Sequence, residues 1–438
     1  MKQHRVRSFP CVRLACVAVV CACAGLSLHA GSVMTAKPEE VGLSSERLTR
    51  VREAVQRHVA AGAVSGAVTL VARHGRIAHL EAHGLIDIGT KRPMPTDGVF
   101  RLASMSKPIT AVAVMMLVEE GTLRLNDPVS RFIPEFKSAK VAVPRPGARG
   151  GGAGAAPPGG RGGPPPEVDV VSATRDITIR DLLTHGSGLM SGGLGNAVAG
   201  PAAARGSSDT LADYIPKLGA VPLDFQPGTL WRYSGLAGFD VLSRVVEIVS
   251  GKTFDRFLRD RLFDPLGMKD TGFPLTPAIQ PRLVPLYRRG QNGLEAVPDQ
   301  NGLSSSTYFS GAGGLVSTAE DYAQFATMLV SGGELNGKRY LSPRTIELMS
   351  SNHTGDLVNG QFGRPARGMG FGLGVQVVED PVAADLRVTK GAWGWAGAYG
   401  TNVHIEPAAN MVTIIMMQTS TPALQRDFEN AVAQAVVK

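Results

Sequence analysis

The chain lacks cysteine everywhere except near its beginning. It has 438 residues and four cysteines, and all four, Cys11, Cys16, Cys21 and Cys23, lie within its first 23 positions. The rest of the chain therefore has no disulfide, no thiol nucleophile and no cysteine-based metal site, whatever the redox state of its compartment. Any catalytic nucleophile has to come from another residue type.

Long apolar runs are also scarce. The first run, from Leu14 to Leu28, follows a basic stretch and precedes Ala30. This order predicts a secretory signal peptide over residues 1–30, because the apolar part is too short to span a bilayer stably. Two alternatives remain open: an N-terminal anchor that stays in place, and a lipoprotein attached through Cys23. No second run of about eighteen apolar residues follows, so the sequence predicts a periplasmic or secreted protein with no stable membrane insertion after cleavage.

The chain has little excess of charge of either sign. The formal net charge of +8 falls to +4 once the basic residues of the predicted signal peptide, Lys2, Arg5, Arg7 and Arg13, are removed. Such a mild balance gives no electrostatic reason to expect nucleic acid or an anionic membrane as a partner. The sequence therefore favours a small-molecule substrate over a charged polymer.

One internal segment cannot form a core. Of the 23 residues in 144–166, 16 are Gly or Pro. This composition predicts a disordered surface insertion. Its three arginines have no aromatic residues between them, so an RNA-binding tract is not indicated.

The two ends of the chain predict one α/β lobe. Leu48, Val51, Val55 and Val59 share a helical face, and two strand-like runs then flank His74-Gly75. At the other end, strand-like runs at 400–407 and 411–418 lead into a helix that Thr421 can cap. We therefore expect an α+β fold in which N- and C-terminal helices flank an antiparallel sheet. One domain, 31–438, then divides into an α/β lobe (36–105 and 305–438) and a mostly helical lobe (106–304).

Ser104 and Lys107 are the first candidate catalytic pair. Residues three apart are neighbours on a helix, and Pro108 and Gly121 suit the first turn and the end of a helix there. A serine at a helix N-terminus has N–H groups nearby that can stabilise an oxyanion, and a buried lysine can take the serine proton as a neutral amine. A Ser-x-x-Lys tetrapeptide alone is a weak signal, and a polar start of a buried helix is the competing interpretation.

Other familiar catalytic patterns are absent from the sequence. No serine has Gly at both the second preceding and second following position, which excludes the nucleophile elbow of α/β-hydrolases, and His-Glu-x-x-His does not occur. His79 and His83 share strand parity but have no third ligand at metal spacing. We therefore expect neither a metal nor a cofactor.

Six stretches in the same order resemble the serine β-lactamase-like superfamily. They are "FRLASMSKPITA", "ITIRDLLTHGSGL", "WRYSGLAGFDVLSRVVE", "FDPLGMKDTGF", "GAGGLVSTAEDYAQF" and "GWAGAYGTNVHIEP". The likeness runs from about Val41 to the C-terminus and points to the branch of class C β-lactamases, family VIII carboxylesterases and D-alanyl carboxypeptidases. It implies a β-lactamase/transpeptidase-like fold and a serine hydrolase.

The resemblance also implies roles for individual residues. Ser104 becomes the nucleophile, with Lys107 and Tyr233 as coupled base and acid, and the N–H groups of Ser104 and Ala398 form the oxyanion hole. Trp395-Ala396-Gly397 becomes the strand that lines the cleft. His185, in "LLTHGSGL", is mainly structural in the family.

Two departures from the penicillin-recognising members indicate the substrate. Gly235 replaces an Asn that contacts a substrate amide, and Trp395 and Ala396 replace a Lys and a Thr that bind a carboxylate. Lys390 is too early in the chain to act in their place. A site without these groups should prefer neutral esters to anionic β-lactams. Trp231 and Trp393 either line an apolar pocket with Trp395 or pack in the core.

Two other functions remain possible at this stage. One is a β-lactamase or D-alanyl carboxypeptidase, which would act on β-lactams or peptidoglycan peptides. The other is a non-catalytic scaffold with the same fold. The substrate would be a small ester or amide, and the sequence does not indicate the oligomeric state.

Overall fold

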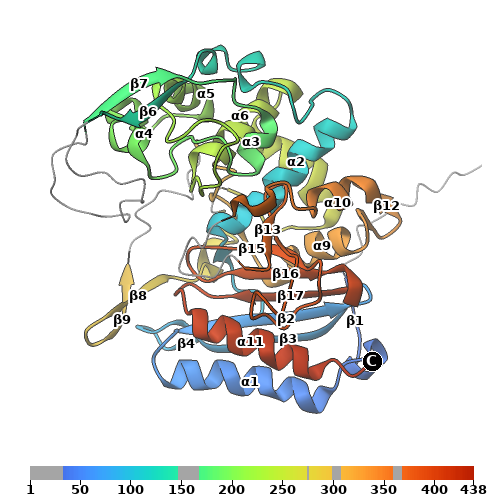
Figure 1. Cartoon of the computed structure of the whole chain (residues 1–438). Coiled ribbons are helices and arrows are strands. Elements are labelled where there is room, and N and C mark those ends of the chain that lie inside the picture. Colours follow the sequence, from blue (N-terminus) through green and yellow to red (C-terminus); the bar gives the residue numbers. More distant parts are fainter. Residues whose placement is uncertain (1–32, 147–166, 274–275, 298–306, 359–366) are drawn as a thin grey trace, which may run out of the picture.

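The fold is built around one large sheet that is almost entirely antiparallel (Figure 1). The computed structural model describes residues 33–146, 167–273, 276–297, 307–358 and 367–438, so the predicted signal peptide lies outside the described residues. The strand order is β1-β3-β2-β17-β16-β15-β14-β13, with β4 paired to β3 and only β1 running parallel to its neighbour. The strands of this sheet are β1 (Met34–Thr35), β2 (Gly66–Arg73), β3 (Arg76–Asp87), β4 (Arg92–Pro93), β13 (Met369–Phe371), β14 (Gln376–Val378), β15 (Trp393–Ala396), β16 (Asn402–Glu406) and β17 (Met411–Met416).

The two ends of the chain meet in this sheet, as the sequence predicts. Strand β17 from the C-terminal end pairs along its whole length with β2 from the N-terminal end, from Val68↔Met416 to Arg73↔Met411. The turn between β2 and β3 is His74-Gly75, where both residues have positive φ, as a two-residue hairpin turn requires. The N-terminal helix α1 (Ser45–Ala60) and the C-terminal helix α11 (Pro422–Ala435) cover one face of the sheet (Figure 1).

The caps of these two helices differ. The Ser44 hydroxyl accepts a hydrogen bond from the Arg47 N–H and caps α1. Thr421 occupies the N-cap position of α11, as predicted, but its hydroxyl makes no capping hydrogen bond and instead points toward the carbonyl oxygens of Ala63 and Thr419, at 3.2 and 3.0 Å. Thr421 thus ties the start of α11 to the loop before β2.

The segment from 106 to 304 contains most of the short helices, together with two hairpins that the sequence did not predict. Strands β6 (Lys140–Pro144) and β7 (Val168–Ser172) pair on either side of the predicted insertion, whose residues 147–166 lie outside the described part of the chain. Strands β8 (Leu286–Gly290) and β9 (Gly293–Val297) form the second hairpin. The helices here are α2 (Lys107–Glu119), α3 (Ile179–Leu183), α4 (Leu194–Ala197), α5 (Leu211–Tyr214), α6 (Ala237–Ser250), α7 (Phe254–Leu258) and α8 (Asp264–Leu266).

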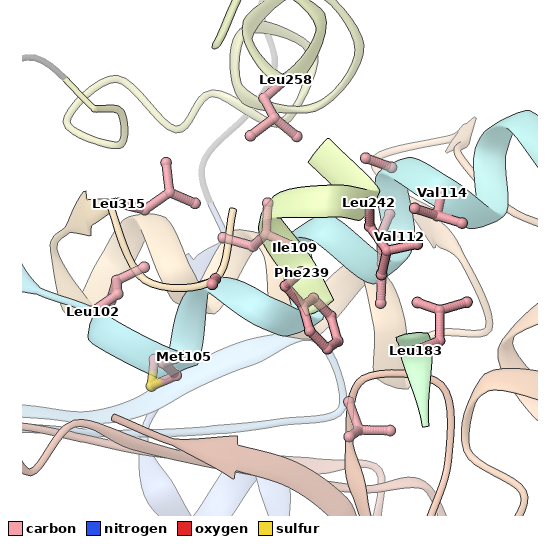
Figure 2. Close-up of a cluster of buried hydrophobic side chains, with 14 of the residues drawn as sticks. Leu102, Met105, Ile109, Val112, Val114, Leu183, Phe239, Leu242, Leu258 and Leu315 are labelled. Atoms are coloured by element: carbon pink, nitrogen blue, oxygen red, sulfur yellow. The ribbon is translucent and has the colours of Figure 1, made fainter. Parts of the chain in front are cut away.

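Helix α2 is the centre of the main core. Its residues from Lys107 to Leu117 are all buried, so it is apolar on every side and has to lie inside the molecule. Figure 2 shows Met105, Ile109 and Val112 among side chains from α3 and α6. The same cluster continues onto the second face of the sheet and includes α9 (Ala319–Val330). The other β-strands and α-helix of the described chain are β5 (Phe100–Arg101), β10 (Val316–Ser317), β11 (Glu334–Leu335), β12 (Lys338–Arg339) and α10 (Pro343–Met349).

Candidate active site

Ser104 lies in a turn of 3-10 helix, Ala103–Ser106, that runs directly into α2. It is the only residue between 102 and 117 that is not buried. The preceding residue, Ala103, has a φ of 47°, in the left-handed region that a residue with a side chain rarely adopts. Such strained backbone is a recurrent feature of functional sites. The turn therefore exposes one hydroxyl at the surface of an otherwise buried segment.

Lys107 is fully buried and is held by three hydrogen bonds. Its Nζ donates to the carbonyl oxygens of Gly235 and Ala312, at 2.7 and 2.8 Å, and lies 3.1 Å from Ser104 Oγ. The two carbonyls come from separate parts of the chain, one just before α6 and one in the segment before β10. Nζ is a tetrahedral nitrogen, and two of its N–H bonds point at these carbonyls. A third tetrahedral position of Nζ therefore points at Ser104 Oγ.

Tyr233 completes the group around Ser104. Its hydroxyl donates to Ser104 Oγ at 2.6 Å, and its ring centroid lies 5.0 Å from Lys107 Nζ. The three side chains that the sequence singled out are thus in mutual contact, although Tyr233 is 129 positions from Ser104 in the chain. This arrangement can activate a serine, because each potential proton acceptor lies within hydrogen-bond distance of the hydroxyl.

The end of β15 lies against the turn that carries Ser104. A Cβ on Gly397 would lie 2.2 Å from the Leu102 carbonyl oxygen and 2.2 Å from Thr401 Oγ1, so only glycine fits. The Thr401 hydroxyl donates to that same Leu102 carbonyl at 3.1 Å. Ala398 follows in an exposed turn. Within the described chain, the backbone N–H groups of Ser104 and Ala398 make no hydrogen bond to another backbone carbonyl.

The three tryptophans differ in their surroundings. Trp393 is buried in the main core, and Trp231 is buried against Phe371 with a ring-centroid distance of 5.4 Å. Their burial favours the core-packing interpretation over a pocket wall. Trp395 is only partly buried, and its ring centroid lies 5.5 Å from that of Tyr233. Trp395 is therefore the tryptophan available to a substrate.

One of the predicted substrate-binding positions, Gly235, leaves space beside this group. Ala396 and Gly235 are both half-buried. A Cβ on Gly235 would meet no atom within 4 Å. The position thus adjoins open space, while its carbonyl accepts from Lys107.

Sequence reasoning missed a buried carboxylate behind Lys107. Asp240, on α6, accepts hydrogen bonds from the Tyr308 hydroxyl (2.8 Å), the Ser310 hydroxyl (2.7 Å) and the Ala312 N–H (3.1 Å). Burial raises the pKa of Asp240, while these hydrogen bonds and the charge of Lys107 oppose the rise. Asp240 thus fixes the loop that supplies the Ala312 carbonyl to Lys107. An Asp among apolar residues in "GFDVLSRVV" was the available signal.

The histidines that the sequence raised as possible ligands lie in β3. His79 Nε2 is 2.9 Å from the Thr69 hydroxyl, and His83 Nε2 is 3.0 Å from a carboxylate oxygen of Glu81. In the described residues, no group of three or more His, Cys, Asp or Glu side chains could hold a metal ion. Lys390 lies in an exposed turn. No helix among these residues is long and apolar enough to cross a membrane.

The fold and site define a class of protein, a serine hydrolase with the β-lactamase/transpeptidase fold. The family model described as Beta-lactamase matches residues 51–438, and the chain belongs to that family. It is 34% identical over 385 residues to Protein Rv1367c of Mycobacterium tuberculosis, covering 85% of this chain and 90% of the relative. Its identity to Esterase EstB of Burkholderia gladioli is 30% over 401 residues, with the same coverages.

A solved structure agrees with this assignment. EstCE1, described as a hydrolase with promiscuous acyltransferase activity, superposes with a TM-score of 0.72 at 28% identity. The superposition covers 89% of this chain and 99% of EstCE1. The expected α+β fold of this superfamily is therefore confirmed.

Proposed function

We propose that this serine hydrolase is a carboxylesterase that forms an acyl-enzyme on Ser104, with Lys107 and Tyr233 as coupled general base and acid. The observation that carries the proposal is the convergence of Lys107 Nζ and Tyr233 OH on Ser104 Oγ, at 3.1 and 2.6 Å. A neutral lysine would keep its two N–H bonds to the carbonyls of Gly235 and Ala312. Its lone pair would then face the serine proton.

The reaction would proceed in two halves. Ser104 Oγ attacks the ester carbonyl carbon while its proton passes to the Lys107–Tyr233 pair, and a tetrahedral oxyanion forms. The bond from carbon to the alcohol oxygen breaks, and the alcohol leaves with that proton. Water then attacks the acyl-enzyme, returns a proton to Ser104 through the same pair and releases the carboxylic acid.

The oxyanion would be held by the N–H groups of Ser104 and Ala398. Support comes from the contact between Gly397 and Leu102, which brings the end of β15 against the serine turn, and from the absence of backbone acceptors for both N–H groups in the described chain. Two preorganised donors in such a position contribute most when charge develops on the oxygen.

Neutral esters are the proposed substrates. The open space at Gly235 offers no side-chain amide, and Trp395 and Ala396 offer no cation to bind a carboxylate. An aromatic wall beside Tyr233 instead favours an apolar acyl or alcohol group. The similarity of this chain to Esterase EstB also supports ester substrates. We further propose that residues 1–30 direct the protein to the periplasm or the exterior.

Two substrates test the proposal. Purified wild type and Ser104→Ala are assayed with p-nitrophenyl butyrate and with a chromogenic cephalosporin. We expect wild type to hydrolyse the ester and Ser104→Ala to lose at least about 10³-fold in kcat. Fast cephalosporin turnover without ester turnover would establish the penicillin-recognising alternative. Inactivity on both, with no labelling of Ser104 by a fluorophosphonate, would favour a non-catalytic scaffold.

A further inference from the structure

His185 is hydrogen-bonded to both neighbours of Tyr233. The Ser234 N–H donates to His185 Nδ1 at 3.3 Å, and the Arg232 N–H donates to the His185 carbonyl oxygen at 3.2 Å. The imidazole also contacts the Tyr233 ring, with ring centroids 4.6 Å apart. One residue therefore fixes the backbone on each side of the tyrosine and supports its ring.

The backbone conformation of His185 is unfavourable for a residue that carries a side chain. It follows α3 and its C-cap Thr184, and its own N–H donates to the Leu182 carbonyl. The next N–H, of Gly186, donates to Asp181, which completes the Schellman pattern of helix ends. His185 has a φ of 58° there, where glycine is usual. Because glycine would end the helix with less strain, the end of α3 does not explain why a histidine stands here.

The environment of the ring selects one protonation state. Burial, with the charge of Lys107 nearby, lowers the pKa of His185 well below its usual value, so the ring is neutral. Because Nδ1 accepts from Ser234, the proton has to be on Nε2. Nε2 has no hydrogen-bond partner in the described part of the structure. The ring is enclosed by Trp231, Phe239 and Phe371, at centroid distances of 6.1, 5.4 and 5.1 Å.

We infer that His185 is a positioning residue that holds the Tyr233 hydroxyl at Ser104, through its Nδ1 acceptor, its carbonyl and its ring face. The inference rests on the proposed function, in which Tyr233 moves the serine proton. His185 itself lies behind the tyrosine and exchanges no proton with the substrate. A displacement of about 1 Å in a catalytic group can lower turnover by about 10²-fold, so loosening Tyr233 should reduce kcat while leaving KM nearly unchanged.

Three substitutions separate the acceptor from the bulk of the side chain. In His185→Asn, Oδ1 takes the place of Nδ1, and Asn tolerates the left-handed backbone. His185→Gly also fits this backbone but has no acceptor for the Ser234 N–H. In His185→Gln, the side-chain amide lies one methylene farther from the backbone than the amide of Asn does, so its oxygen does not take the place of Nδ1. We expect kcat for p-nitrophenyl butyrate to stay within about fivefold of wild type in the Asn variant and to fall by about 10²-fold in the other two. Equal kcat values in the Asn and Gln variants would overturn the inference, and this comparison remains decisive if the Gly variant does not fold.

A double-mutant cycle shows whether His185 acts through Tyr233. In a Tyr233→Phe background, the change from His185 to Gln should lower Ser104 acylation by less than about twofold, because the group that His185 positions is gone. A merely structural role would give the same large loss in both backgrounds, and that result would also overturn the inference.

Amide hydrogen exchange tests the contact without requiring turnover. The Ser234 amide should exchange at least about tenfold faster in the Gly and Gln variants than in wild type and the Asn variant. If wild type shows no Ser104-dependent turnover, the proposed function fails while this measurement still decides whether His185 anchors the tyrosine segment. Unchanged Ser234 exchange in the Gln variant would refute the anchoring.

Discussion

At the scale of single residues, the site combines contacts between residues close in sequence with contacts between residues far apart in sequence. Ser104 and Lys107 are three positions apart, and helical geometry brings them together. The carbonyls that hold Lys107 lie 128 and 205 positions away. Local spacing predicted the pair, whereas nothing local predicts which carbonyls orient the amine.

Gly397 gives a prediction at this scale. In Gly397→Ala, the new Cβ would lie 2.2 Å from the Leu102 carbonyl, which belongs to backbone and cannot swing away. The end of β15 would have to move from the serine turn, and we expect kcat/KM for the ester to fall by about 10²-fold.

Gly238→Ala is the matched control for that substitution. Its Cβ would meet the nearest atom at an ordinary 3.7 Å, and alanine suits the interior of α6. We expect this variant to retain the wild-type rate. Wild-type activity in Gly397→Ala would show that β15 does not need to approach Leu102 closely.

At the scale of elements, Asp240 links α6 to the loop 308–312 that supports Lys107. Asp240→Ala would leave two hydroxyls and the Ala312 N–H without their acceptor in a buried place. We expect the free energy of unfolding to fall by about 3 kcal/mol. Ser310→Ala removes one donor only and should cost about 1 kcal/mol. Urea unfolding measures the free energy of unfolding of both variants. Equal losses in the two would show that Asp240 does not hold this hydrogen-bond network together.

Strand β3 gives a prediction about pH. Burial lowers the pKa of His79 to about 4, although the nearby Glu81 carboxylate opposes this. The unfolded chain, with a histidine pKa near 6.5, then binds a proton that the folded chain does not, so stability falls as the pH drops below about 6.5. Between pH 6 and 5, the free energy of unfolding of His79→Gln should fall by about 1 kcal/mol less than that of wild type. Urea unfolding at each pH measures this free energy. Parallel plots of the unfolding free energy against pH for the two proteins would refute the lowered pKa of His79.

At the scale of the whole molecule, the paired strands β6 and β7 are separated in sequence by the Gly- and Pro-rich segment. β6 ends at Pro144, β7 starts at the residue paired with it, Val168, and the Arg145 N–H donates to the Glu167 carbonyl. The described residues that flank 147–166 are therefore close together. Replacing 147–166 by Asn-Gly should leave kcat/KM within about twofold and change the Tm by only a few degrees. A folded variant that has lost the activity would show that the segment serves the site.

The sequence alone determined the framework of the fold and predicted the residues of the candidate site. Periodicity in the two ends of the chain predicted α1, the β2–β3 hairpin, the last two strands and α11, because these elements follow from local patterns. Motif order likewise singled out Ser104, Lys107 and Tyr233. The hairpins β6–β7 and β8–β9 were not predicted, since their short strands alternate too weakly to be distinguished from loops.

Only the tertiary structure decided how these groups are held. It buried Trp231 and Trp393 and left Trp395 beside Tyr233, because the exposure of an aromatic ring depends on what packs over it from elsewhere in the chain. It also brought Asp240 behind the loop of Ala312, and His185 against Tyr233. These contacts join segments about 50 to 70 positions apart, and the spacing of residues along a chain does not specify contacts over such separations.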